Sequence, residues 1–426
     1  MHAYQPLCLP ASAAARRAAP LSVLLAALAW LPALAQEAPP TAADLFSAQV
    51  VHELRLSMFS GDWELLQARF MENTYYPVDV AWNGVVVRNA GVRSRGTGSR
   101  DARKPALKID FSQYVSGQTF VGLKSLALDN FRQDAGMIKE VVTSELFRRV
   151  GQVAPRASHA RVYVNNEYIG LYAILEPIDK TFLKTWLGEN DGYLFEFNWS
   201  NNWYFEYLGT DLSRYAAMFE AKTHEDDPPE RLHGPIERMV EAANHASMAM
   251  WEAATSRYLD LDVLLRYVAV ETFLADHDGF AGDWGLNNFY LYRFADSERS
   301  QVLPWDKDVN FREVDRGVFE GFEPNVLLAT ALRVPRLREA YLDALSRCAA
   351  SADEPSPDGP GAGWLQREVA RQIDMIRTAA YEDVRKAYTN ERFEEEASWM
   401  IAFARRRGGE VLGQIAREGA RRSGAP

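Results

Sequence analysis

The chain has 426 residues, of which 47% are hydrophobic and 25% are charged, and its formal net charge is −11. These values are typical of a folded globular protein and exclude an intrinsically disordered chain. The acidic balance argues against non-specific nucleic-acid binding, which needs clustered positive charge, so we expect no nucleic-acid partner.

Residues 1–35 have the pattern of a secretory signal peptide. Arg16 and Arg17 precede the apolar run LSVLLAALAWLPALA, which ends in small residues at Ala33 and Ala35. The run is shorter than the roughly 20 residues of a membrane-spanning helix. We therefore expect cleavage after Ala35, no stable membrane span afterwards, and a protein that is periplasmic, secreted or bound at the cell surface.

The cysteine content is that of a chain that folds without disulfide bonds. After signal cleavage Cys348 is the only cysteine left, which excludes an intrachain disulfide and a cysteine-based metal site. Its apolar helical surroundings indicate a buried core residue and not a nucleophile.

A flexible lead-in at 36–43 precedes a β-rich N-terminal lobe that we place at 44–180. Residues 51–58 and 76–87 alternate at period two, and Asn83-Gly84 predicts a hairpin turn. Segment 105–111 alternates too, with Leu107, Ile109 and Phe111 on one face. A helix is predicted over 137–151, ending at Gly151, and a second hairpin over 160–178, turning at Asn165-Asn166.

The second lobe, 181–426, is predicted to be mainly helical. A short hairpin at 287–306 interrupts it, and the predicted helices span 235–256, 261–277, 334–350, 363–388 and 391–417. A β-rich half followed by a helical half, with polar residues at their junction, predicts a two-lobed α+β protein with a cleft.

The polar residues of the helical half gather in two segments. Asp278 follows a helix end, Asn287 and Asn288 open the next strand, and Asp306 and Asp308 end its hairpin partner. Carboxylate and amide oxygens suit Mg²⁺ or Mn²⁺. The order Asp, Asn, Asp is also that of phosphoryl-transfer sites, where the first Asp orients the attacking hydroxyl and the others hold metal. The alternative is that all are turn and cap residues.

The N-terminal half contributes basic residues. The loop RSRGTGSR at 93–100 has glycines that allow close backbone approach, and Arg95, Ser99 and Arg100 are candidates to cradle an anion. Lys108 points away from the apolar side of its strand. Glu140 is a candidate partner for Lys108, with a solvent-facing helix residue as the alternative.

Taken together, these segments resemble the spore-coat CotH kinase family of atypical secreted or surface protein kinases. The resemblance covers nearly all of the chain after the signal peptide. Its markers, in order, are AGVRSRG, KPALKIDF, GQTFVGLKSLALDN, VYVNNEYIGLYAILEPID, DHDG followed by NNFYLY, and LPWDKD. The sequence departs from the family in two asparagines where a His-Asn pair is frequent and in Lys307 where a hydrophobic residue is usual.

The resemblance implies a two-lobed kinase-like fold that binds ATP with Mg²⁺ or Mn²⁺ and phosphorylates serine or threonine of a protein, such as an envelope or coat protein. Asp278 is then the catalytic aspartate, and Asp306 is a metal ligand with Asn288 or Asn287. Lys108 contacts the phosphates. Further implied residues are Asp308, as a second ligand or a cap, and, around the nucleotide, Arg95, Ser99, Arg100, Glu140 and Glu176, the last near the adenine pocket.

Two other functions compete with a kinase. One is a surface, assembly or adhesion protein that keeps the fold without turnover. The other is a carbohydrate-active enzyme with paired carboxylates, which leaves Lys108 and the basic loop unexplained. We expect Lys307, between the two aspartates of LPWDKD, to point to solvent.

Overall fold

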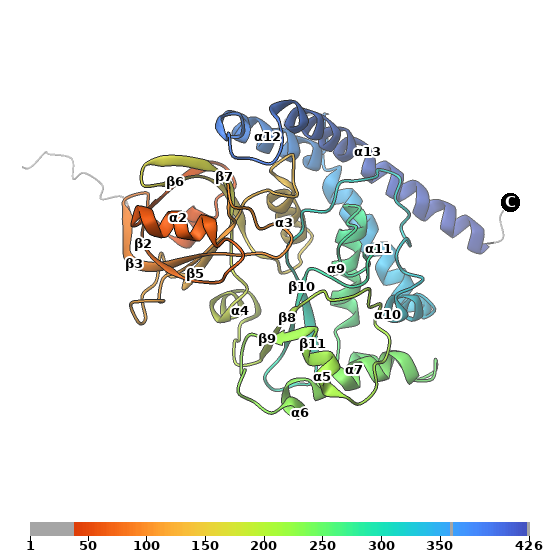
Figure 1. Cartoon of the computed structure of the whole chain (residues 1–426). Helices are drawn as coiled ribbons and strands as arrows, with labels where there is room; N and C mark the ends of the chain where they lie inside the picture. The colour runs from red at the N-terminus through yellow and green to blue at the C-terminus, as the bar shows by residue number, and fades with distance from the viewer. Residues whose placement is uncertain (1–37, 358–360, 424–426) are drawn as a thin grey trace, which may run out of the picture. The chain divides into compact units, whose positions relative to one another are not determined.

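The period-two segments of the first half form a closed barrel. The computed structural model describes residues 38–357 and 361–423, and the predicted signal peptide lies outside them. The strands follow the order β1-β2-β3-β4-β5-β7-β6, and a parallel pairing of β1 with β6 closes the ring (Figure 1). They are β1 (Val51–Ser57), β2 (Tyr76–Trp82), β3 (Val85–Ser94), β4 (Leu107–Asp110), β5 (Ser125–Asp129), β6 (Ala157–Val164) and β7 (Glu167–Leu175).

The barrel is filled by the apolar residues of this alternation. Leu107 and Ile109 of β4 are fully buried in the core cluster that the strands share, as is Phe111 just after the strand. Lys108 lies between them, and because side chains alternate along a strand it faces out of the barrel. The strand that fills the barrel therefore also presents a lysine to the rest of the protein.

Both hairpins predicted in the first half are confirmed, and their turns explain why the sequence revealed them. Asn83 and Gly84 join β2 to β3 with φ of 45° and 78°, and Asn165 and Asn166 join β6 to β7 with φ of 49° and 70°. Two consecutive positive φ angles match the twist of the flanking strands and favour asparagine and glycine.

Helix α3 (Lys139–Arg149) connects the barrel with the helical half. It contacts β6 on one side and α9, α11 and α12 on the other. The prediction of 137–151 was close, and Gly151 takes the left-handed conformation (φ 80°) expected just after a helix. Being buried against both sides, α3 can place Glu140, in its first turn, between them.

A second, four-stranded antiparallel sheet lies in the helical half, in the order β11-β10-β8-β9. The β10–β11 hairpin was predicted, whereas the other two strands were not, because they are short and no tight turn joins them. The four are β8 (Tyr193–Phe197), β9 (Phe219–Ala221), β10 (Phe289–Arg293) and β11 (Ser300–Pro304).

The helices differ from the predictions at their ends. The predicted helix 235–256 is two helices, because the chain becomes extended at Ala246 and turns so that the Trp251 indole donates to the Ala243 carbonyl. The helix predicted to reach 277 ends at Phe273. The helices are α1 (Ala42–Leu45), α2 (Ser60–Ala68), α4 (Lys180–Leu187), α5 (Leu212–Ala216), α6 (Pro229–Leu232), α7 (Gly234–His245), α8 (Trp251–Ser256), α9 (Leu261–Phe273), α10 (Val326–Ala331), α11 (Pro335–Ala352), α12 (Trp364–Glu382) and α13 (Asn390–Ser423).

A barrel followed by a mainly helical half confirms the predicted α+β class (Figure 1). Residues 40–426 form one compact unit, so the lobe boundary placed at 180 remains a prediction. Within the part of the chain that the structure describes, no helix combines the length and apolar character needed to cross a membrane.

Candidate active site

The loop after α9 carries Asp278 and is held by its own acidic residues. Ala275 has a φ of 52°, which ends the helix and reverses the chain. The Asp276 carboxylate then accepts the main-chain N–H of Asp278 at 2.9 Å. The N–H of His277 donates to the Val309 carbonyl at 3.1 Å, which ties this loop to the segment that follows Asp306.

Asp278 and the two asparagines come together. The two Asp278 oxygens accept one amide N–H each, from Asn287 and Asn288, both at 3.0 Å. Burial raises the pKa of Asp278 above its usual range, while the hydrogen bond from Asn287 opposes the rise. The carboxylate is thus oriented by two neutral donors and made a better proton acceptor than an exposed aspartate.

Asp306 lies in the same region, just beyond β11. Its φ is 53° and that of Asn288 is 57°, so the chain reverses at both positions. The main-chain N–H of Trp305 donates to the Asn288 carbonyl at 3.3 Å, which joins the two turns. Burial raises the pKa of Asp306 to about 6, and the negative charge of Asp278 adds to the rise.

Asp308 is buried and Glu140 is half-buried, and the charge of Asp306 acts on both. Burial raises the pKa of Asp308 far above its usual range, with Asp306 as the largest charge contribution. Burial and the charge of Asp306 raise the pKa of Glu140 to about 8. Glu140 accepts the main-chain N–H of Lys307 at 2.5 Å. It shows no contact with Lys108 within the described ranges, so the structure does not bring together the pair considered from the sequence.

These oxygens fit a metal that is shared with a bound nucleotide. In the described part of the chain no three or more His, Cys, Asp or Glu side chains are placed to hold a metal by themselves. Mg²⁺ commonly binds to one or two protein oxygens and completes its shell with phosphates and water. Asn288 and Asp306, whose turns are joined through the Trp305 N–H, would supply such a pair. A ligand role for Asp308 stays a prediction.

The barrel carries two of the candidate cations, Lys108 and Arg95. The Lys108 ammonium makes no hydrogen bond or ion pair with any described residue, and burial together with the charge of Arg93 lowers its pKa. The charges of Lys222, just after β9, and of Glu196 in β8 also act on the pKa of Lys108. The Arg95 guanidinium lies 4.0 Å from the Asp129 carboxylate and 5.4 Å from the centre of the Trp305 ring, and its charge lowers the pKa of Asp306.

The other two candidate side chains of the loop 93–100, Ser99 and Arg100, are in contact with nearby parts of the protein. The Arg100 guanidinium donates to the carbonyls of Gly96 at 2.6 Å and of Phe70 at 2.7 Å. Gly96 has a φ of 92°, and a β carbon there would lie 2.4 Å from the Ser99 hydroxyl oxygen. Arg100 and Ser99 therefore shape the loop, and the structure leaves Arg95 as its cation nearest to Asp306.

The Glu176 carboxylate also has hydrogen-bond partners within the protein. The residue directly follows β7 and is 3% exposed. Its carboxylate accepts Nε and Nη2 of Arg156 at 3.0 and 2.6 Å and faces the Trp186 indole N–H at 3.3 Å. These partners make the side chain a structural ion pair, and an adenine contact remains a prediction.

The expectation that Lys307 points to solvent is wrong. Its side chain is 3% exposed, and its ammonium lies 2.5 Å from Glu271 and 3.4 Å from Asp276. The reversal at Asp306 turns the next side chain inward. Glu271, an acid among the buried residues of α9, was the signal in the sequence that an inward cation was needed.

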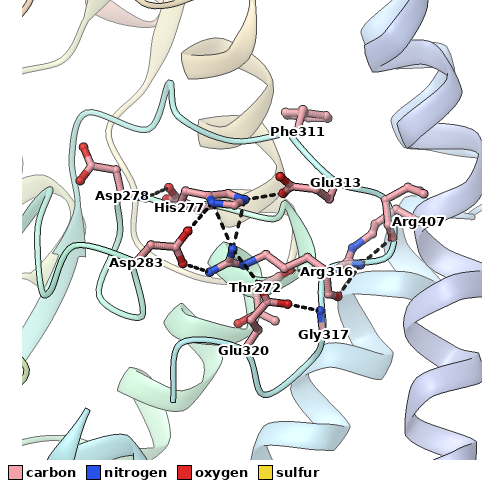
Figure 2. Close-up of polar contacts among 12 residues, drawn as sticks. Thr272, His277, Asp278, Asp283, Phe311, Glu313, Arg316, Gly317, Glu320 and Arg407 are labelled. Atoms are coloured by element: carbon pink, nitrogen blue, oxygen red, sulfur yellow. Dashed lines mark hydrogen bonds and ion pairs between the residues drawn. The ribbon is translucent and has the colours of Figure 1, made fainter. Parts of the chain in front are cut away.

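A second network beside Asp278 was not predicted at all (Figure 2). His277 Nδ1 lies 2.6 Å from an Asp283 carboxylate oxygen, and Nε2 contacts Glu313. The buried Arg316 guanidinium lies 2.7 Å from Asp283 and 3.1 Å from both ring nitrogens. Arg316 comes from the segment after Asp306, so the network fastens that segment to the loop of Asp278.

Arg407 of α13 holds the same segment from its other side (Figure 2). Its fully buried guanidinium donates to the carbonyls of Val314 and Arg316, and also to those of Thr272 and Phe273 at the end of α9. Nothing in the arginine-rich sequence of α13 separated this residue from its exposed neighbours.

This chain is similar to a known protein family and to a spore coat protein. The family model described as CotH kinase protein matches residues 92–411, about three quarters of the chain. The inner spore coat protein H of Bacillus subtilis (strain 168) is 25% identical over 333 residues, which cover 74% of this chain and 83% of that protein.

Two solved structures are distantly similar. A chain of the HipA, HipB and operator DNA complex of Shewanella oneidensis MR-1 has 14% identity and a TM-score of 0.32, covering 68% of this chain and 60% of that one. The Helicobacter pylori proinflammatory kinase CtkA has 10% identity and a TM-score of 0.29, covering 70% and 92%. On the extent of the family match, which agrees with the motifs in the sequence, this chain belongs to the CotH kinase family.

Proposed function

We propose that this protein is an exported kinase that transfers the γ-phosphoryl group of ATP to a serine or threonine hydroxyl of a protein. The observation that carries the proposal is the Asp278 carboxylate, which is held by Asn287 and Asn288 and lies close enough to Asp306 for their charges to interact. Family membership supports the reaction class, and the predicted signal peptide supports export.

Asp278 orients the attacking hydroxyl and accepts its proton. The hydroxyl oxygen forms a bond to the γ-phosphorus as the bond from that phosphorus to the ADP oxygen breaks. Two amide donors fix the direction of the carboxylate before the substrate arrives. Such fixed orientation is a main source of catalysis in phosphoryl transfer.

Asn288 and Asp306 would hold Mg²⁺ or Mn²⁺ with the nucleotide. The cation, when bound, neutralises negative charge on the phosphates. Lys108 and Arg95 serve the same phosphates from the barrel, since Lys108 has no protein partner among the described residues and the charge of Arg95 reaches Asp306.

A second candidate is a surface or assembly protein that binds nucleotide without turnover. It is favoured by the similarity to the inner spore coat protein H of Bacillus subtilis. The two functions share nucleotide binding and differ in transfer. An envelope or coat protein would be the substrate in the first case and the assembly partner in the second.

The test is phosphoryl transfer by the purified protein from Gln36 onward. With Mn²⁺ and radiolabelled ATP, wild type should label itself or a serine-containing protein, and D278N should not. Thermal shift with ATP and Mn²⁺ measures binding separately, because a bound ligand raises the apparent stability. Equal label on both proteins would refute catalysis by Asp278, and binding without label would favour the second candidate.

A further inference from the structure

Lys307 occupies a buried position between the two halves of the candidate site. Its ammonium is surrounded by protein, 2.5 Å from Oε1 of Glu271 and 3.4 Å from Oδ2 of Asp276. It is adjacent in sequence to Asp306, whereas its acidic partners belong to α9 and to the loop of Asp278. A lone buried ammonium is unstable without paired carboxylates, so these contacts determine where the side chain can lie.

Each acidic partner also holds the main chain of the catalytic loop. The second oxygen of Glu271 accepts the N–H of Phe280 at 2.9 Å. Gly279 packs so closely on this carboxylate that a β carbon there would lie 2.5 Å from Oε1. The second oxygen of Asp276 accepts the N–H of Asp278 at 2.9 Å.

The main chain of Lys307 is fixed from the opposite direction. Its N–H donates to Glu140 of α3 at 2.5 Å, and its carbonyl accepts the Asn310 amide at 2.8 Å. These bonds hold the turn that carries Asp306. The main chain of this one residue is thus tied to the metal side of the site, while its side chain is tied to the proton-accepting side.

We propose that Lys307 is a positioning residue that sets Asp278 relative to Asp306. The ammonium fixes two carboxylates, and each of them fixes an N–H on either side of Gly279. This inference deepens the kinase proposal and rests on it for its catalytic consequence. A hydrophobic residue of similar length would fill the space but would leave both carboxylates free to turn.

The first test is the kinetics of Lys307→Met. We expect kcat to fall about 10- to 100-fold, because displacements on the order of 1 Å have that effect, with little change in the KM for ATP. In case K307M does not fold, K307M/E271Q removes one uncompensated charge and keeps an acceptor for Phe280. Wild-type kcat in a folded variant without Lys307 overturns the inference.

Lys104→Met is the matched control. Lys104 is 2% exposed and ion-paired to Asp383 at 2.7 Å, but it lies at the barrel and contacts neither Asp278 nor Asp306. K104M should lose stability while kcat per folded molecule stays as in wild type. An equal fall of kcat in K104M and K307M would make the effect one of general stability and would overturn the inference.

Hydrogen exchange separates this inference from the kinase proposal. Amides of residues 276–280 should exchange faster in K307M than in wild type and K104M, and this readout needs no turnover. If wild type shows no phosphoryl transfer, the proposed function fails while exchange still decides the role of Lys307. Unchanged exchange in K307M overturns the positioning role, even where kcat is lost.

Discussion

The Lys104 ammonium and the Asp383 carboxylate form a buried ion pair, 2.7 Å apart, between the barrel and the end of α12. The same carboxylate accepts the main-chain N–H of Leu171 in β7 at 3.1 Å. Asp383 therefore satisfies one charge and one main-chain donor of the barrel at once. The helix predicted to continue to 388 ends at Glu382, where the following chain turns to make these contacts.

Gly170 should be indispensable for this contact. Its φ is 135°, and a β carbon would lie 2.6 Å from an Asp383 oxygen. We expect G170A to lower the free energy of unfolding by about 2–3 kcal/mol more than G188A, measured by urea denaturation. Gly188 is the control because it too has a positive φ, 80°, with no atoms near its β position. Equal losses would show that the close approach to Asp383 is unimportant.

Arg407→Ala should loosen the segment that follows Asp306. It removes the donor of four buried carbonyls, which should cost about 3–5 kcal/mol of unfolding free energy. Limited proteolysis should then cut within 309–325. Arg406, exposed on the same helix, supplies the control R406A, which should change neither stability nor cleavage. Cleavage that is unaltered in R407A would contradict the clamp.

Substitutions of the two asparagines beside Asp278 should have different effects, one on ATP binding and the other on kcat. Asn288→Ala should weaken Mn²⁺-dependent ATP binding about 10- to 100-fold, because Asn288 is the proposed ligand. Asn287→Ala should keep binding and lower kcat, since it removes only a hydrogen bond that orients Asp278. Isothermal titration with ATP and Mn²⁺, together with kinetics, measures both effects. The reverse assignment follows if N287A is the variant that loses binding.

Lys108 and Glu176 should also behave differently. Lys108→Met should weaken ATP binding about 10-fold or more and leave the melting temperature of the free protein nearly unchanged, because Lys108 has no ion-pair partner within the described ranges. Glu176→Gln should lower the melting temperature by breaking the pair with Arg156. Loss of ATP affinity in E176Q at constant stability would restore the nucleotide-binding role considered for Glu176.

His159 should make folding sensitive to mild acid. It is fully buried, with Nε2 2.8 Å from the Met137 carbonyl, and burial lowers its pKa from 6.5 to about 4. The unfolded chain therefore takes up a proton at a higher pH than the folded one. The stabilising contribution is complete above pH 6.5 and is lost as the pH falls toward 4, by about 1.4 kcal/mol per pH unit.

Comparison with His159→Leu isolates this contribution. Buried acids such as Glu140 titrate over the same range with the opposite sign, so the wild-type curve alone is ambiguous. The difference in unfolding free energy between wild type and H159L should shrink by roughly 3 kcal/mol between pH 6.5 and 4. His245→Leu, at an exposed position, is the control. A difference that does not vary with pH would show that His159 does not titrate as inferred.

The sequence predicted features that depend on local chemistry. Asn83-Gly84 signalled its hairpin because the turn needs positive φ, and the buried alternation of β4 identified the outward Lys108. The grouping of Asp278 with Asn288 was also expected, since Asp278 follows the end of α9 and Asn288 directly precedes β10.

Features that depend on distant partners were missed. Lys307 was expected at the surface. Its partner Glu271 belongs to another element, and the turn at Asp306 sets the direction of the Lys307 side chain. The hydrogen bonds of Arg100 to the carbonyls of Phe70 and Glu72 were likewise not expected, and its role as an anion ligand stays a prediction. A charged residue in a sequence does not reveal whether a carboxylate, a carbonyl or water will face it.

The Arg407 clamp also bears on when the protein can fold. The barrel strands leave the ribosome first, at roughly 5–20 residues per second. The end of α9 and the segment of Arg316 come later, and both need α13 to bring the guanidinium that binds their carbonyls. Contacts between residues so far apart in the chain form slowly. The candidate active site is therefore completed only after synthesis has passed Arg407, so a nascent chain stalled before that point lacks the contacts that hold this site.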